Sequence, residues 1–83
     1  MDPMVIVVRA FAGARDIVGA RSIEIEVPAT VTVGQVWEAL CARYPGLTGL
    51  RLRGLALNHA YVSFEQPVHE GDEVAIIPPV SGG

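Results

Sequence analysis

The sequence predicts an α+β fold in which one main helix covers one face of a mixed sheet of four to five strands. The chain has 83 residues, 51% of them hydrophobic, which is enough for one domain and its core. Only the segment 32–45 shows the apolar spacing of a substantial helix. Short β-branched or alternating segments surround it, so we expect the helix to pack on strands.

Two predicted strands precede the main helix. Residues 4–10 contain the run VIVV, which is typical of an interior strand. Residues 11–19 (FAGARDIVG) favour a short irregular helix, because one glycine interrupts the segment and another closes it. Residues 22–27 (SIEIEV) alternate strictly between apolar and acidic side chains, which predicts a half-buried strand. The two strands lie close enough in the chain to pair as a hairpin.

The main helix is the clearest element. Thr32, followed three residues later by Gln35, fits a capping box at its start. Pro45-Gly46 then ends it. Between these signals, apolar residues recur at i, i+3, i+4, i+7 and i+8 and form one stripe: Val33, Val36, Trp37, Leu40 and Cys41.

The remainder of the chain is predicted to form short strands joined by turns. The predicted segments are a loop with room for a helical turn (47–53), a strand (55–58), a turn at Asn58-His59, a returning strand (61–64), a turn (70–72) and a last strand (73–77) that the following prolines end.

The order of these elements predicts how they assemble. The last strand is expected beside the first, because the most apolar strands belong in the middle of a sheet. The result is a roll of the ubiquitin-like, β-grasp kind. We therefore divide the chain into a β-grasp domain (1–77) and a flexible C-terminal tail (78–83) that ends in Gly-Gly.

A single helix leaves the second face of the sheet open. Arg9 cannot lie unpaired in a dry core, so its side of the first strand is predicted to face outward. Exposed contiguous apolar surface usually marks a partner site, although loops folding over this face are an equal alternative at this stage. The residues predicted there are Val7, Phe11, Tyr61, Ile77 and Val80, with Ser81 following in the tail.

Charge and hydropathy exclude several classes of partner. The net charge of -3 argues against nucleic acid, because phosphate binding needs a basic face. No stretch approaches the ~20 apolar residues of a membrane span. The start of the chain lacks the features of a signal peptide, so we expect a cytoplasmic location and no membrane partner.

Candidate metal and catalytic residues are sparse. The single Cys41 allows no internal disulfide and lies on the apolar stripe of the helix, where a buried, inert thiol is expected. His59 and His69 lie in separate loops without ligand spacing, so no metal site is predicted. No Ser–His–Asp arrangement or carboxylate pair is visible. We therefore expect no catalysis by this chain alone and no cofactor bound to it.

The C-terminal segment PPVSGG is the strongest functional signal. The prolines hold the backbone extended, and residues 78–83 can reach about 20 Å at about 3.3 Å per residue. Gly82 and Gly83 lack side chains and can enter a channel too narrow for other residues. The terminal α-carboxylate is ionised at neutral pH. If another enzyme adenylates it with ATP, a sulfur or nitrogen nucleophile can attack the resulting acyl-adenylate.

Three segments carry a resemblance to a known family. They are RAFAGARDIVG near the start, the capped helix, and LALNHAYVSFEQPVHEGDEVAIIPPVSGG at the end, of which GDEVAIIPPVSGG is the most specific part. Together they resemble the MoaD/ThiS sulfur-carrier family, on its MoaD branch, over essentially the whole chain. Arg15 and Asp16 match a pair in that family, with Asp in place of the more usual Glu, and no chemistry is assigned to them.

The resemblance implies a function for the tail. It implies that Gly83 is adenylated by an E1-like activating enzyme that uses ATP, and is then converted to a thiocarboxylate, with Gly82 giving access. It further implies that the tail enters the large subunit of molybdopterin synthase, in a heterotetramer. Sulfur would there be transferred to cyclic pyranopterin monophosphate.

Three alternatives remain open from the residues. The chain could carry sulfur for thiazole or another thiometabolite. It could be a ubiquitin-like protein modifier, and the absence of lysine from the sequence fits this alternative and sulfur transfer equally. It could also be a plain binding module with an inert tail.

Overall fold

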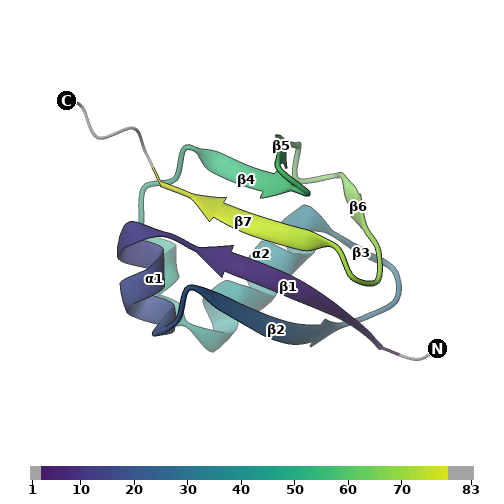
Figure 1. The fold of residues 1–83 in the computed structure, drawn as a ribbon, viewed down its shortest axis with the longest axis horizontal. Helices are drawn as coiled ribbons and strands as arrows, with labels where there is room; N and C mark the ends of the chain where they lie inside the picture. Colours follow the sequence, from purple (N-terminus) through teal and green to yellow (C-terminus); the bar gives the residue numbers. More distant parts are fainter. Residues whose placement is uncertain (1–2, 79–83) are drawn as a thin grey trace.

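The structure is a computed structural model, and it describes residues 3–78 of the chain. A five-stranded sheet, in the order β2-β1-β7-β4-β5, carries the helix α2 across one face (Figure 1). The elements are β1 (Met4–Ala10), α1 (Ala12–Val18), β2 (Ser22–Val27), β3 (Val31–Thr32), α2 (Val33–Arg43), the 3-10 helix η1 (Pro45–Gly49), β4 (Gly54–Leu57), β5 (Ala60–Tyr61), β6 (Pro67–Val68) and β7 (Glu73–Ile77). The predicted β-grasp fold is confirmed.

Strand β1 lies inside the sheet, between β2 and the central strand β7. It pairs with β2 in antiparallel register, with Ile6 opposite Ile25, and with β7 in parallel register, with Val8 opposite Val74. The predicted placement of the last strand beside the first is therefore correct. The connection between β1 and β2 is longer than a tight hairpin turn, because it contains α1 (Figure 1).

Helix α2 begins and packs as the sequence predicts. The hydroxyl of Thr32 accepts a hydrogen bond from the N–H of Gln35 (3.2 Å), and the side-chain oxygen of Gln35 accepts one from the N–H of Thr32 (2.9 Å). This reciprocal pair is a capping box, which satisfies N–H groups that the first helical turn leaves free. Val33, Val36 and Leu40 are fully buried against the sheet.

The core lies between α2 and one face of the sheet. Alternation along β1 turns Ile6, Val8 and Ala10 inward, and all three are buried. Val74 and Ile76 of β7 point the same way and are also buried. Arg9 is exposed on the opposite side, which confirms the predicted direction of the sheet faces.

Three strands differ from the prediction: the returning strand is shorter, and two short strands near the start of α2 were not predicted. The returning strand predicted at 61–64 ends at Tyr61, because the chain then turns toward the helix and the carbonyl of Phe64 accepts from the N–H of Gly34 (2.8 Å). Strands β3 and β6 form a separate two-stranded sheet, with Val31 opposite Val68. Each has two residues, too few to show an alternating pattern.

The turn between β4 and β5 contains two residues with positive φ. Asn58 has φ 49° and His59 has φ 75°, which is the geometry of a type I′ hairpin turn. The Asn58 side chain donates to a carboxylate oxygen of Asp72 (3.1 Å) and accepts from the N–H of Glu73 (3.0 Å). These bonds stabilise Asn58 in the left-handed region. The structure gives the exposed side chain of His59 no such bond within residues 3–78.

Replacing His59 by glycine should therefore stabilise the protein. Glycine adopts positive φ without the steric cost of a Cβ atom, which is about 1 kcal/mol at a left-handed position. We expect His59→Gly to raise the free energy of unfolding by that order in urea titration. Gly19, with φ 86° and no atom within 4 Å of an added Cβ, is the matched control. Gly19→Ala should destabilise by a similar amount, and equal stability of both variants with the parent chain would contradict this account.

Candidate functional site

The open face of the sheet lies opposite α2 and is built from β1, β7, β4 and β5 (Figure 1). The structure places the predicted residues Val7 and Ile77 there as half-buried side chains. Phe11 and Tyr61 are more exposed, at 40% and 59%. These exposures show that no loop of residues 3–78 folds over the face, so that alternative is wrong.

A groove of about 360 Å³ runs across this face. We call it the outer groove. Ala56 of β4 and Ala75 of β7 lie opposite each other in its lining, with the larger side chains of Phe11, Tyr61 and Ile77 around them. The two alanines were not among the predicted site residues, although alternation along β7 points Ala75 outward. Their small side chains let a partner approach the sheet backbone closely.

Arg9 and Glu73 border the same groove. The Arg9 Nε atom lies 3.7 Å from a carboxylate oxygen of Glu73, and both side chains are partly exposed. An ion pair of this kind contributes little to stability because water screens it. It provides a polar border to an otherwise apolar groove. Such a surface, apolar in the middle and polar at the edge, is typical of protein–protein interfaces.

The C-terminal segment begins beside the outer groove. The carbonyl of Ile77 accepts from the N–H of Arg53 (3.0 Å) where β7 ends, and Pro78 follows. Proline cannot donate to the sheet, so the ladder stops there. The other predicted site residues, Val80, Ser81, Gly82 and Gly83, lie outside the described residues, and their roles stay predictions.

Cys41, Arg15 and Asp16, which the sequence also singled out, lie outside the lining of the outer groove. Within residues 3–78, no three His, Cys, Asp or Glu side chains gather closely enough to hold a metal ion. Cys41 is half-buried beside the core, and burial raises the pKa of its thiol. Arg15 and Asp16 are exposed on α1. No helix among these residues has the length and hydropathy to cross a membrane.

The fold and this surface define a ubiquitin-like β-grasp domain whose C-terminal segment leaves from the central pair of strands. Comparison with known proteins narrows the class. A sequence model described as the ThiS family matches residues 8–83. The chain belongs to the ThiS family, as the resemblance of its C-terminal segment predicted.

Individual relatives agree with this assignment. The chain is 38% identical to the molybdopterin synthase sulfur carrier subunit of Homo sapiens over 77 aligned residues. This alignment covers 88% of each sequence. It is 37% identical to small archaeal modifier protein 3 of Haloferax volcanii, covering 90% of this chain and 95% of that protein. The fold superimposes on a putative molybdopterin converting factor, subunit 1, of Pyrococcus furiosus with a TM-score of 0.84, at 28% identity over 93% of this chain and 99% of that chain.

The thiol of Cys41 should react slowly in the folded protein. Burial raises its pKa, so a smaller fraction is thiolate at neutral pH than in an exposed cysteine. We expect the pH profile of alkylation by iodoacetamide to lie at higher pH for the folded chain than for the chain in urea. Rapid alkylation of the folded chain near neutral pH, followed by mass spectrometry, would contradict this.

Proposed function

We propose that this chain is a sulfur carrier that acts as the small subunit of a molybdopterin synthase. The observation that carries the proposal is the family match, which extends through the terminal Gly82-Gly83. The relative from Homo sapiens is named a molybdopterin synthase sulfur carrier subunit and is similar over most of this chain. The open outer groove beside the start of the tail supports a carrier that docks on larger proteins.

The proposed chemistry takes place at the Gly83 carboxylate. A carboxylate oxygen attacks the α-phosphorus of ATP in the activating enzyme, pyrophosphate leaves, and an acyl-adenylate forms. Sulfide then attacks the acyl carbon and AMP leaves, which yields the thiocarboxylate and releases a proton. Transfer of that sulfur to cyclic pyranopterin monophosphate, with water restoring the acid, returns the carrier to its starting state.

The chain itself is proposed to be non-catalytic. In this proposal it binds no cofactor, because ATP binds to the E1-like activating enzyme and the pterin to the large subunit. Its folded domain presents the tail, and the outer groove docks on each partner in turn. Two large subunits would bind two copies of this chain in a heterotetramer.

Removing Gly83 should separate docking from sulfur transfer. We expect the chain without Gly83 to bind the large subunit with the affinity of the intact chain, because the outer groove is unchanged. It should form no thiocarboxylate and support no pterin product in a reconstituted reaction with activating enzyme, ATP and sulfide. Intact-protein mass spectrometry measures the exchange of oxygen for sulfur. Product formation at the normal rate without Gly83 would overturn the proposal.

A charge placed in the outer groove should weaken docking on the large subunit, which the removal of Gly83 leaves unchanged. Ala75→Arg puts a long cation between Phe11 and Tyr61, so we expect binding to the large subunit to weaken at least about tenfold, or about 1.4 kcal/mol. The matched control is Ala39→Arg, an exposed position on α2 away from the sheet. Calorimetry measures both affinities, and circular dichroism checks the fold. Equal weakening by both variants would contradict docking through this groove.

A second function is favoured by one comparison. The similarity to small archaeal modifier protein 3 is consistent with a ubiquitin-like modifier, which forms isopeptide bonds through the same terminal glycine. Transfer to thiazole or another thiometabolite uses the same thiocarboxylate. Reconstitution with each acceptor distinguishes them: pterin product supports the main proposal, whereas a ladder of conjugates in cell extract supports the modifier.

A further inference from the structure

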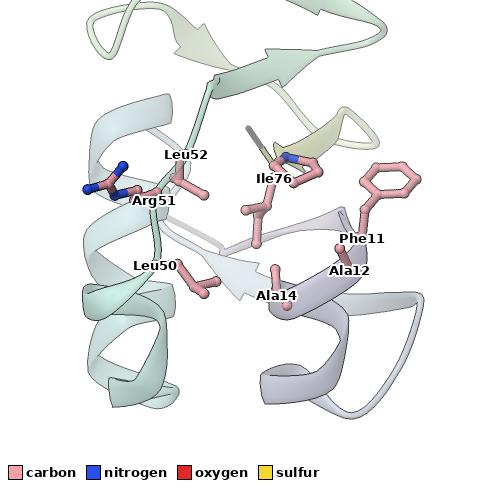
Figure 2. A pocket seen from close by; sticks show the side chains of 9 residues that line it. Phe11, Ala12, Ala14, Leu50, Arg51, Leu52 and Ile76 are labelled. Atoms are coloured by element: carbon pink, nitrogen blue, oxygen red, sulfur yellow. The ribbon is translucent and has the colours of Figure 1, made fainter. Parts of the chain in front are cut away.

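A second apolar pocket lies at the base of the C-terminal segment. It has a volume of about 360 Å³ and lies between α1 and the loop that leads to β4. Figure 2 shows Leu50 and Leu52 on one side, Ala12 and Ala14 on the other, and Ile76 between them. Pro78, where the tail begins, also belongs to the lining. The pocket is therefore next to the segment that the proposed function uses.

The pocket stays open because the residues on its α1 side are small. Ala12, Gly13 and Ala14 contribute at most one methyl group each. Ala12 also adopts a positive φ of 50°, which an alanine tolerates only at a steric cost. An open apolar hollow forfeits the packing contacts that larger side chains would supply. The Ala12 conformation belongs to the turn from β1 into α1, where the carbonyl of Phe11 accepts from the N–H of Ala14 (3.1 Å). The open hollow is unfavourable for the isolated domain, and it is explained if the pocket receives a side chain from another molecule.

The pocket is continuous with the proposed docking face. Phe11 lines both this pocket and the outer groove, and its ring stands at the boundary between them. A partner that covers the outer groove would thus reach the pocket on the other side of the Phe11 side chain. The tail leaves the domain from Pro78, so a partner that receives the tail must pass close to Leu52 and Ile76.

All six arginines of the chain are near those ends of the helices and strands that lie at the pocket end of the molecule. Strands β1 and β7 are parallel and end there, whereas β2 and β4 run the opposite way and begin there. The arginines are at the end of β1, on α1, before β2, at the end of α2 and before β4: Arg9, Arg15, Arg21, Arg43, Arg51 and Arg53.

The acidic residues are distributed differently. Among residues 3–78, only Asp16 lies on the elements at the pocket end. The others lie midway along β2 and α2 or toward the far end of the sheet: Glu24, Glu26, Glu38, Glu65, Glu70, Asp72 and Glu73. Arg9 lies 3.7 Å from Glu73, so its charge is offset, and the positive charge of the pocket end comes from the other five arginines although the whole chain is acidic. Arg51 and Arg53 are exposed beside the pocket, and the guanidinium of Arg51 points away from it into the surroundings (Figure 2).

We infer that this tail-base surface, the pocket together with Arg51 and Arg53, binds an acidic protein segment that carries an apolar side chain. The apolar side chain fills the pocket between Leu50 and Ala14, and neighbouring carboxylates pair with the two arginines. The inference rests on the proposed function in one respect: the segment would belong to the rim of the channel that receives the tail.

The two parts of the surface have different effects. Burial of an aliphatic or aromatic side chain in the pocket supplies most of the affinity, because exposed ion pairs are weak in water. The arginines orient the encounter, since opposite charges steer two proteins toward one relative orientation. Nucleic acid does not fit, because its phosphates would find no apolar group for the pocket and would be repelled by the rest of the chain.

A peptide titration tests this chemistry directly. The probe is an acetylated pentapeptide with a central leucine and two glutamates on each side, added to the full-length isotopically labelled chain. We expect saturable chemical-shift changes at the amides of residues 12–14 and 50–52. Replacing the central leucine by alanine, or the glutamates by lysines, should weaken binding at least about tenfold, which corresponds to about 1.4 kcal/mol.

Charge variants make the test specific. Arg51→Glu with Arg53→Glu should reverse the preference, so that the lysine-flanked peptide binds better than the glutamate-flanked one. The control is Arg21→Glu, which lies at the same end of the molecule but outside the pocket lining. At physiological ionic strength, salt screens charges that are more than about 8 Å apart. We therefore expect the peptide affinity of this control to stay within about twofold of that of the parent chain. Both positions of the double variant are exposed, so the fold is retained.

Several outcomes would overturn the inference. The first is a titration in which the chemical-shift changes do not saturate. The second is a set of chemical-shift changes confined to Ala56 and Tyr61 in the outer groove. The third is a peptide with central alanine that binds as tightly as the peptide with central leucine. A Val80→Ser variant that binds the peptide more tightly would mean that the chain's own tail fills the pocket. A chain that acquires sulfur at Gly83 yet ignores the peptide overturns this inference alone. A chain that binds the peptide but never acquires sulfur overturns the proposed function alone.

Discussion

The parallel pairing of β1 with β7 is the contact on which the rest of the structure depends. It brings the two most apolar strands together in the middle of the sheet and places the end of β7 at the same edge as the end of β1. Val8 and Val74 are fully buried beneath α2, so this register cannot slip without turning the core residues outward. The place where the C-terminal segment starts is therefore determined by core packing.

The same register explains why one face of the sheet is available for docking. Each strand that buries apolar side chains under α2 must direct alternate residues to the opposite face. With one helix long enough to cover a face, the described chain cannot cover both. The small side chains of Ala56 and Ala75 then leave a groove in the uncovered face, next to the end of β7. The proposed docking and the proposed presentation of the tail thus both depend on one strand pairing.

Most of the strands and the start of the main helix could be predicted from the sequence, because the residue patterns that indicate them are local and strong. The alternation in SIEIEV, the run VIVV and the Thr32–Gln35 capping box each depend on neighbouring residues, and β1, β2, β7 and the start of α2 agree with them. Strands β3 and β6 could not be predicted, because each is held only by the other, far away in the sequence. The tail-base pocket was missed for a related reason. Its walls come from α1, the loop before β4 and β7, and no local pattern indicates that Ala14 will face Leu50.

The positive φ angles of Asn58 and Ala12 have local structural causes. At Asn58 the left-handed backbone is stabilised by two side-chain hydrogen bonds, and the residue types fit a tight hairpin turn. Ala12 has no polar side chain to make such bonds, but it lies in the turn that leads from β1 into α1, where the carbonyl of Phe11 accepts from the N–H groups of Ala14 (3.1 Å) and Arg15 (3.4 Å). Both conformations therefore follow from backbone or side-chain hydrogen bonds at a change of chain direction, and the inference about the tail-base surface depends on its apolar lining and its arginines instead.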